Sequence, residues 1–167
     1  MSNFRQSVFN DHSFNPNLLT ADLRTVDART RDLLNRSVQW TRAEEIYGNF
    51  GPNLFREIDP KVIGPSTNIP EYTFWKVLRH MASHPELVRS VFVIRDEERS
   101  GRYSMYVWKD NSRVEVEIDT VIPTINGQHA FCQVTSSDIW PILFEKAVVK
   151  AYGSLGILFG RKLLIRT

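Results

Sequence analysis

The sequence contains almost no cysteine: Cys132 is the single one among 167 residues. A lone cysteine cannot form a disulfide within the chain or a cysteine-based metal site, and disulfides are the mark of oxidising compartments. The scarcity of cysteine therefore indicates a reducing environment, and we expect the protein to be cytoplasmic.

The sequence also lacks an excess of charge of one sign and any long apolar run. Lysine and arginine number 21, aspartate and glutamate 19, and the formal net charge is +2. So small and interspersed a charge argues against a nucleic-acid partner. No apolar run approaches the roughly 18–20 residues that span a bilayer, and the start MSNFRQSVFN lacks the apolar core of a signal peptide. We therefore expect no membrane partner.

The chain has no internal repeats, and its length with 42% hydrophobic residues predicts one globular domain. Residues 1–36 are polar with a weak helical stripe, which predicts an N-terminal arm with one short helix. Residues 37–167 are expected to form the domain. Within it, residues 47–70 are rich in glycine and proline, which predicts an ordered loop.

Three segments carry strong secondary-structure patterns. In residues 72–88, YTFWKVLRHMASHPELV, helical spacing predicts a buried face and Pro85 a break or a new helix start. The stripe consists of Phe74, Val77, Leu78, Met81 and Ala82. Apolar residues alternate on both sides of KDNS, which predicts a β-hairpin over residues 102–119.

The acidic side chains of the second hairpin strand are Glu115, Glu117 and Asp119. They are expected on a solvated face rather than in a cation site. The third segment, SSDIWPILFEKAVVKAYG, predicts a helix with Ser137 as N-cap and Gly153 as its stop. The buried stripe of this helix is predicted to consist of Trp140, Phe144, Ala147, Val148 and Ala151. The tail ILFGRKLLIRT is compatible with a strand, a helix end or a partner contact. Together these patterns predict an α+β fold with helices packed on a small antiparallel sheet.

The motifs follow an order that resembles the first of the two lobes of the protease core in calpains, a family of papain-like cysteine proteases. They are FNDHSF, WTRAEEI, the helix bearing Trp75 followed by HPELV, the strand end EIDTVIPTINGQHAF, and DIWPILFEKAVVKAYGS at residues 138–154. The last is the most specific, with Phe144 in place of a leucine. The resemblance runs from about residue 9 to 156 and implies a papain-like first lobe.

In active calpains the catalytic cysteine directly precedes the tryptophan of this helix, within a Gly-Asp-Cys-Trp motif. The resemblance places Phe74 in that slot before Trp75, Tyr72 and Thr73 in place of Gly-Asp, and Asn68 where the family has its oxyanion-hole glutamine. A phenyl ring cannot replace a thiolate nucleophile. The family's histidine and asparagine belong to a second lobe, for which the chain after this helix is too short. We therefore expect a pseudoenzyme without catalytic residues.

The resemblance also raises the question of calcium binding, because classical calpain lobes bind this ion. Glu145 is similar in position to a ligand glutamate, but the partner aspartate is Pro65 and a loop glycine is Pro60. One carboxylate with two prolines is a poor cage for a cation that prefers many oxygens. We expect no calcium and no other cofactor. Glu145 is then expected to be a solvated or ion-paired residue beside Lys146, with a calcium ligand as the weaker alternative.

Two further residue pairs suggest chemistry. His80 and His84 stand four residues apart and could offer two imidazoles to a metal, but no third ligand is evident, so exposed helix histidines are the favoured interpretation. Cys132 near His129 could form a displaced dyad. Its apolar flanks instead favour a small buried residue.

The tryptophans have two interpretations as well. Trp75, Trp108 and Trp140 fall on expected elements and are interpreted as core, while Trp40 matches a family position that packs the arm on the lobe. The alternative is an exposed hot spot. A lone lobe must also cover the face that meets the second lobe, which Phe74 makes more apolar. The candidates for partner binding are Phe74, Trp75 and Trp40.

These expectations converge on a catalytically inactive structural or protein-interaction module. Shortened calpain-like proteins occur in cytoskeletal and flagellar settings, and the resemblance implies a cytoskeletal or ciliary location with microtubule or axonemal partners. The alternative is a regulatory subunit or decoy that controls a catalytic calpain. A third possibility is an enzyme with unfamiliar chemistry, which loss of activity on Cys132→Ala would reveal.

Overall fold

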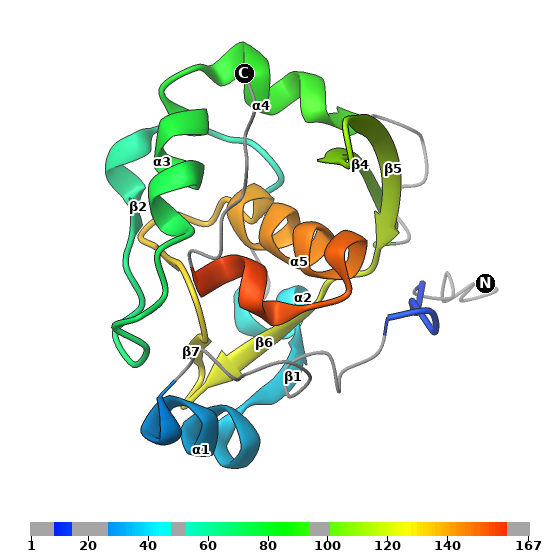
Figure 1. The fold of residues 1–167 in the computed structure, drawn as a ribbon. Coiled ribbons are helices and arrows are strands. Elements are labelled where there is room, and N and C mark those ends of the chain that lie inside the picture. Colours follow the sequence, from blue (N-terminus) through cyan, green and yellow to red (C-terminus); the bar gives the residue numbers. More distant parts are fainter. Residues whose placement is uncertain (1–8, 15–26, 48–52, 94–100, 160–167) are drawn as a thin grey trace, which may run out of the picture.

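The computed structural model describes residues 9–14, 27–47, 53–93 and 101–159. These residues form an α+β fold in which helix α5 (Trp140–Tyr152) lies in the middle, with the other helices and three small sheets around it (Figure 1). The predicted fold class is confirmed. No helix in the described ranges is both long enough and apolar enough to cross a membrane.

The elements of the described part are short, and α5, with 13 residues, is the longest helix among them. The helices of the described part are α1 (Ala28–Ser37), α2 (Ala43–Tyr47), the 3-10 helix η3 (Pro60–Val62), α3 (Trp75–Ala82), α4 (Pro85–Val91), α5 and the 3-10 helix η5 (Leu155–Phe159). The strands are β1 (Gln39–Arg42), β2 (Ile63–Gly64), β3 (Phe92–Val93), β4 (Tyr103–Lys109), β5 (Ser112–Ile118), β6 (Val121–Ile125), β7 (Gln128–His129) and β8 (Gln133–Val134). The sheet orders are β1-β6-β7, β2-β8 and β3-β4-β5, and all pairings are antiparallel.

The predicted hairpin is formed by β4 and β5, with Lys109 opposite Ser112. Asp110 and Asn111 between them have φ of 51° and 62°, as a two-residue hairpin turn requires. Met105 and Ile118 point into the core, where both strands pack against α5.

The expected solvated acidic face is wrong at its last residue. Glu115 is exposed and Glu117 half-buried, but Asp119 is buried at the end of the hairpin. Asp119 forms an ion pair with Lys146 of α5. The cause is that α5 lies against this end of the sheet, and a strand pattern alone does not reveal it.

Helix α5 stops as predicted, at Gly153 with a left-handed φ of 67°, but it does not begin as predicted. Ser137 is not its N-cap, because Ile139 precedes the first helical residue. Ser137 instead accepts a hydrogen bond from the backbone N–H of Asn53. The next acidic residue, Asp138, accepts hydrogen bonds from two backbone N–H groups of the 53–57 segment. The residues before α5 therefore bind the loop rather than the helix end.

The segment 72–88 forms two helices, and Pro85 starts the second, as one of its two expected roles. Leu78, Met81 and Ala82 of the predicted stripe are buried, whereas Val77 is half-buried. The stripe thus faces the core as helical spacing predicts.

The tryptophans divide between core and surface. Trp140 is buried at 1% exposure, Trp75 is half-buried, and Trp108 is 65% exposed. The expectation that Trp108 belongs to the core is wrong. Side chains alternate along β4, so Met105 and Val107 face α5 while Trp108 points to the other face of the sheet.

The N-terminal segment is tied to the domain. The backbone N–H of Asp11 donates to the Asp119 carboxylate, and Lys150 of α5 donates to the Asp11 carboxylate. Helix α1 begins after its N-cap Asp27 and continues to Ser37, one residue past the predicted end of the arm at residue 36. Residues 15–26 of the predicted arm and the tail beyond residue 159 lie outside the described residues.

Candidate functional site

The start of helix α3 is the place where the resemblance puts a nucleophile. Phe74 precedes the helix with a helical backbone conformation and is only 4% exposed. Its ring stacks on Phe144 of α5, with centroids 6.4 Å apart and planes 15° apart. The position therefore holds a packed hydrocarbon ring, which has neither a proton to lose nor a lone pair for attack on a carbonyl.

The backbone next to Phe74 is also occupied. The N–H of Thr73 donates to the carbonyl of Leu158 at 3.2 Å, so η5 packs against the start of α3. The carbonyl of Thr73 accepts from the N–H of Lys76 at 3.1 Å. The tail after Gly153 thus packs against this site through η5. The described start of the segment ILFGRKLLIRT, residues 157–159, is helical, which is one of the alternatives that its sequence leaves open.

Asn68, which the resemblance places at the oxyanion-hole position, is half-buried in the loop before α3. Its backbone N–H donates to Oγ of Ser66 at 3.3 Å, and the hydroxyl of Ser66 donates to the carbonyl of Ala130 at 2.9 Å. Ser66 is a buried residue that the sequence analysis did not identify. It fixes the loop on which Asn68 lies, and its place among small polar loop residues gives no signal in the sequence.

Trp75 is the one partner-binding candidate whose ring carries charged neighbours of the same helix. The guanidinium of Arg79 lies 4.8 Å from the Trp75 ring centroid and Nζ of Lys76 lies 5.8 Å from it. Arg79 Nε also donates to the carbonyl of Ile63 at 2.9 Å. This surface, Trp75 with Lys76 and Arg79, is called the Trp75 surface below.

Trp40 packs the N-terminal segment on the domain, as expected. The rings of Trp40 and Phe14 make an edge contact with centroids 5.3 Å apart. Nζ of Lys146 lies 4.8 Å from the Phe14 ring centroid and 5.9 Å from that of Trp40. Trp40 is therefore half-buried beneath residues of its own chain.

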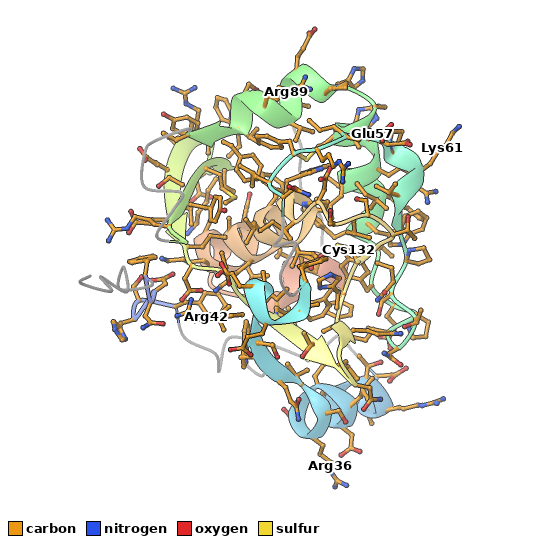
Figure 2. The ribbon with its side chains drawn as sticks, turned by 180° about the vertical axis from the view of Figure 1, so that it is seen from behind. Arg36, Arg42, Glu57, Lys61, Arg89 and Cys132 are labelled. Atoms are coloured by element: carbon orange, nitrogen blue, oxygen red, sulfur yellow. The ribbon has the colours of Figure 1, made fainter. Side chains whose placement is uncertain are left out.

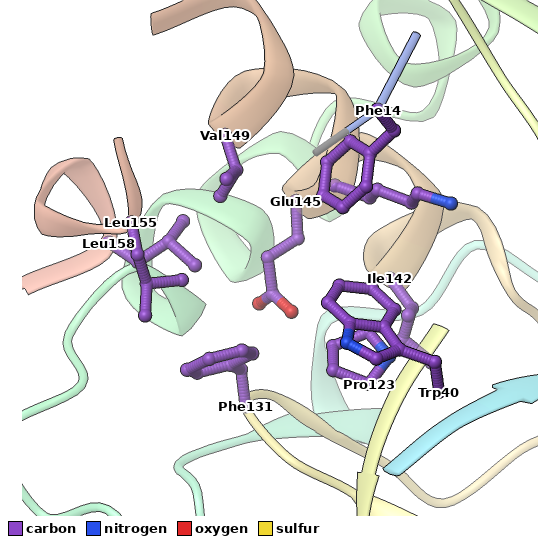
Figure 3. Close-up of a pocket in the computed structure, with 10 residues that line it drawn as sticks. Phe14, Trp40, Pro123, Phe131, Ile142, Glu145, Val149, Leu155 and Leu158 are labelled. Carbon is purple, nitrogen blue, oxygen red and sulfur yellow. The ribbon is translucent and has the colours of Figure 1, made fainter. Parts of the chain in front are cut away.

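Glu145 lies in the core, and the expectation of a solvated or ion-paired residue is wrong. It is 4% exposed, and the hydroxyl of Tyr72 donates a hydrogen bond to its Oε2. Figure 3 shows its carboxylate among Phe131, Ile142 and Leu158, which line a small cavity. Helix α5 is buried on nearly every side, so a residue outside its predicted stripe still points into protein.

The pKa values of this cluster follow from its burial. Burial raises the pKa of Glu145 to about 7, although hydrogen bonds from Tyr72 and Cys132 oppose the rise. Burial, with the nearby Glu145 charge, raises the pKa of the Tyr72 hydroxyl and that of the Cys132 thiol well above their usual values. We call these three residues, Tyr72, Cys132 and Glu145, the Glu145 cluster.

Cys132 is a buried free cysteine, as its apolar flanks predict. Figure 2 shows it inside the molecule, whereas Lys61 and Arg89 extend from the surface. Burial lowers the pKa of His129 to about 4. The His129 Nε2 atom shares a hydrogen bond with the Tyr47 hydroxyl at 2.8 Å, and its Nδ1 has no partner among the described residues. The raised pKa of Cys132 disfavours its thiolate, and the lowered pKa of His129 makes its imidazole a weak base, so the two residues do not form a nucleophilic dyad.

The described residues hold no group of three metal-ligating side chains. His80 and His84 are exposed with ring centroids 5.3 Å apart, and no third ligand joins them. The groups around Glu145 do not fit calcium either. The Glu145 carboxylate accepts a hydrogen bond from the Tyr72 hydroxyl, and the Glu145 cluster contains no second carboxylate.

Comparisons with known proteins identify the family of the chain. The sequence profile described as calpain family cysteine protease matches residues 9–163. Calpain-C of Drosophila melanogaster is 42% identical over 55 residues, which are 32% of this chain and 8% of the fly protein. The match thus spans less than a tenth of that relative. The extent of the profile match and the α+β fold show that the chain belongs to the calpain family of cysteine proteases.

Proposed function

We propose that this calpain-like chain is a catalytically inactive protein-interaction module. The observation that carries the proposal is Phe74, a buried ring stacked on Phe144 in the slot where the family resemblance places the nucleophile. A second lobe supplied from elsewhere would bring a histidine and an asparagine, but it would not supply a thiolate at this helix.

The state of the neighbouring groups supports the same proposal. The Thr73 N–H is bonded to Leu158, so it is not free to stabilise an oxyanion. The thiol of Cys132 is buried and its pKa is raised, which disfavours the reactive thiolate. The Cys132 thiol therefore offers no substitute for the missing nucleophile.

The partner-binding site that we propose is the Trp75 surface. Phe74 is buried, and the ring of Trp40, half-buried like that of Trp75, packs against Phe14, so Trp75 is the candidate that we favour. Lys76 and Arg79 are exposed, and neither makes an ion pair within the described part of the chain. An aromatic ring beside two exposed cations, of which Arg79 is also hydrogen-bonded to the Ile63 carbonyl, suits a partner that presents carboxylates.

The partners that we propose are cytoskeletal or ciliary filament proteins, including microtubule or axonemal components. The support is that calpain-like proteins without a full catalytic group, which this chain resembles, occur in such assemblies, together with the cationic character of the Trp75 surface. The second candidate function is a regulatory subunit or decoy for a catalytic calpain. Burial of Phe74 disfavours docking of a protease on that residue itself.

The first test is a peptidase assay of the purified chain with casein and with a thiol-reactive active-site probe. We expect no cleavage and no labelling, because no accessible thiolate is present. We also expect no cleavage by Phe74→Cys. Activity that disappears in Cys132→Ala would overturn the proposal in favour of an enzyme with unfamiliar chemistry.

The second test crosslinks the chain in gently fractionated source cells and identifies its neighbours by mass spectrometry. The interaction module predicts crosslinks from Lys76 to filament proteins in a detergent-resistant fraction, with Lys109 on the far hairpin as the comparison site. Trp75→Ala should remove these crosslinks. Trp108→Ala is the matched control, because Trp108 is a more exposed tryptophan on another element. Crosslinks to a soluble protease with its own catalytic residues would favour the regulatory function instead.

A further inference from the structure

The Glu145 cluster joins three segments that are distant in the sequence. Tyr72 precedes α3, Cys132 precedes β8, and Glu145 lies in the second turn of α5. The Tyr72 hydroxyl donates to Oε2 of Glu145, and the ring of Tyr72 packs at 5.7 Å against Phe131. The bond therefore fastens the chain before α3 to the central helix.

Each member of the cluster is enclosed. Tyr72 is 1% exposed, Glu145 is 4% exposed, and Cys132 is fully buried. The family resemblance implies that a carboxylate at this position binds calcium, which takes six to eight oxygen ligands at about 2.3–2.6 Å. Here the carboxylate accepts hydrogen bonds from protein donors, and Pro65 in the preceding loop offers no carboxylate.

We propose that the Tyr72 hydroxyl takes the place of a cation at Glu145, so that this calpain-like chain keeps its fold without binding calcium. The proposal concerns the stability of the domain and does not depend on which partner the Trp75 surface binds. Its physical basis is that a buried carboxyl group must be satisfied by a cation, by hydrogen-bond donors or by a proton.

The cluster uses the second and third of these means. Tyr72 is the donor, and the pKa of Glu145, raised to about 7 by burial, leaves the carboxyl group partly protonated at neutral pH. The ionisable groups that face Glu145 are the Tyr72 hydroxyl and the Cys132 thiol. The adjacent Lys146 does not face it, because its ammonium group is bonded to Asp119 and to the carbonyl of Val121.

The experiment is thermal unfolding of the purified full chain in excess calcium chloride and in EGTA, followed by calorimetric titration with calcium. We expect one melting temperature in both buffers and no saturable heat of binding. A melting temperature that rises with calcium, by an amount that Glu145→Gln abolishes, would overturn the proposal. The titration of the unaltered chain decides this point even if a variant does not fold.

The role of the hydroxyl is tested with Tyr72→Phe, which keeps the ring and removes the donor. We expect a lower melting temperature that calcium does not restore. Tyr152→Phe is the matched control, because the Tyr152 hydroxyl donates to the Trp108 carbonyl at an exposed site, and it should shift the melting temperature little. Equal melting temperatures of Tyr72→Phe and the unaltered chain would contradict the replacement of a cation by this hydroxyl.

Discussion

The carboxyl group of Glu145 links the stability of the domain to pH. Its pKa is about 7 in the folded chain and 4.5 in the unfolded chain, so the folded state holds this proton more tightly. The stabilisation is complete below pH 4.5 and is lost as pH rises to about 7, by an amount on the order of 3 kcal/mol. Glu145→Gln should remove this loss in urea unfolding measured from pH 4.5 to 8.

The control for this measurement is Glu86→Gln, at an exposed position of α4. It should leave the pH dependence of the unfolding free energy unchanged. If Glu145→Gln and Glu86→Gln have the same pH profile as the unaltered chain, Glu145 is ionised at the same pH in both states.

His129 acts in the opposite direction. Its pKa is about 4 when folded against 6.5 when unfolded, so its contribution to stability is complete above pH 6.5 and is lost as pH falls toward 4. Because the residue is only half-buried, we expect a loss on the order of 1–2 kcal/mol. His129→Gln should flatten the acid side of the stability profile. A profile still sloping equally between pH 6.5 and 4 in that variant would assign the slope to other groups.

The residues that sequence analysis placed wrongly share one physical cause. Trp108, Asp119 and Glu145 were expected in the opposite environments. Local spacing shows which side chains lie on the same face of an element, but not how many faces other elements cover. A usable signal was present in α5, where apolar residues such as Ile142, Leu143 and Val149 fall outside the predicted stripe. A helix apolar on all sides is usually buried on all sides.

At the scale of elements, spacing and turn chemistry predicted some boundaries correctly and missed others. The hairpin, the start of α4 at Pro85 and the end of α5 at Gly153 all follow from local rules. The start of α5 did not follow, because Ser137 and Asp138 bind a loop more than 80 positions away in the sequence. Contacts of that separation leave no trace in a local pattern. The site at α3 was located only through the family resemblance.

The end of α5 provides a prediction for a single element. Gly153 has a φ of 67°, a conformation that residues with a Cβ atom adopt at a cost, although the surrounding space is open. Gly153→Ala should lower the free energy of unfolding by about 1 kcal/mol. Gly64→Ala, in open space without a positive φ, is the matched control and should be close to neutral. Circular dichroism melts compare the two, and an equal loss in both would assign the effect to something other than the helix end.

At the scale of the whole molecule, a buried ion pair joins the hairpin to the central helix. The ammonium group of Lys146 bonds to Asp119, and both side chains are almost fully buried. Lys146→Met would leave Asp119 without its counter-ion, and we expect a loss of about 3–5 kcal/mol in urea unfolding. Adding Asp119→Asn should recover much of this loss, because no buried charge then remains. Additive losses in the double variant would show that the two residues do not act as a pair.

The attachment of the N-terminal segment has a consequence for synthesis on the ribosome. Asp11 is bonded to Lys150, 139 positions later, and its N–H is bonded to Asp119. Asp11 leaves the exit tunnel 139 residues before Lys150, so its native contacts cannot form until nearly the whole described domain has been translated. Translation at about 5–20 residues per second keeps this segment exposed for seconds. Nascent chains stalled before residue 150 has emerged should remain open to proteases and chaperones at their N-terminal segment.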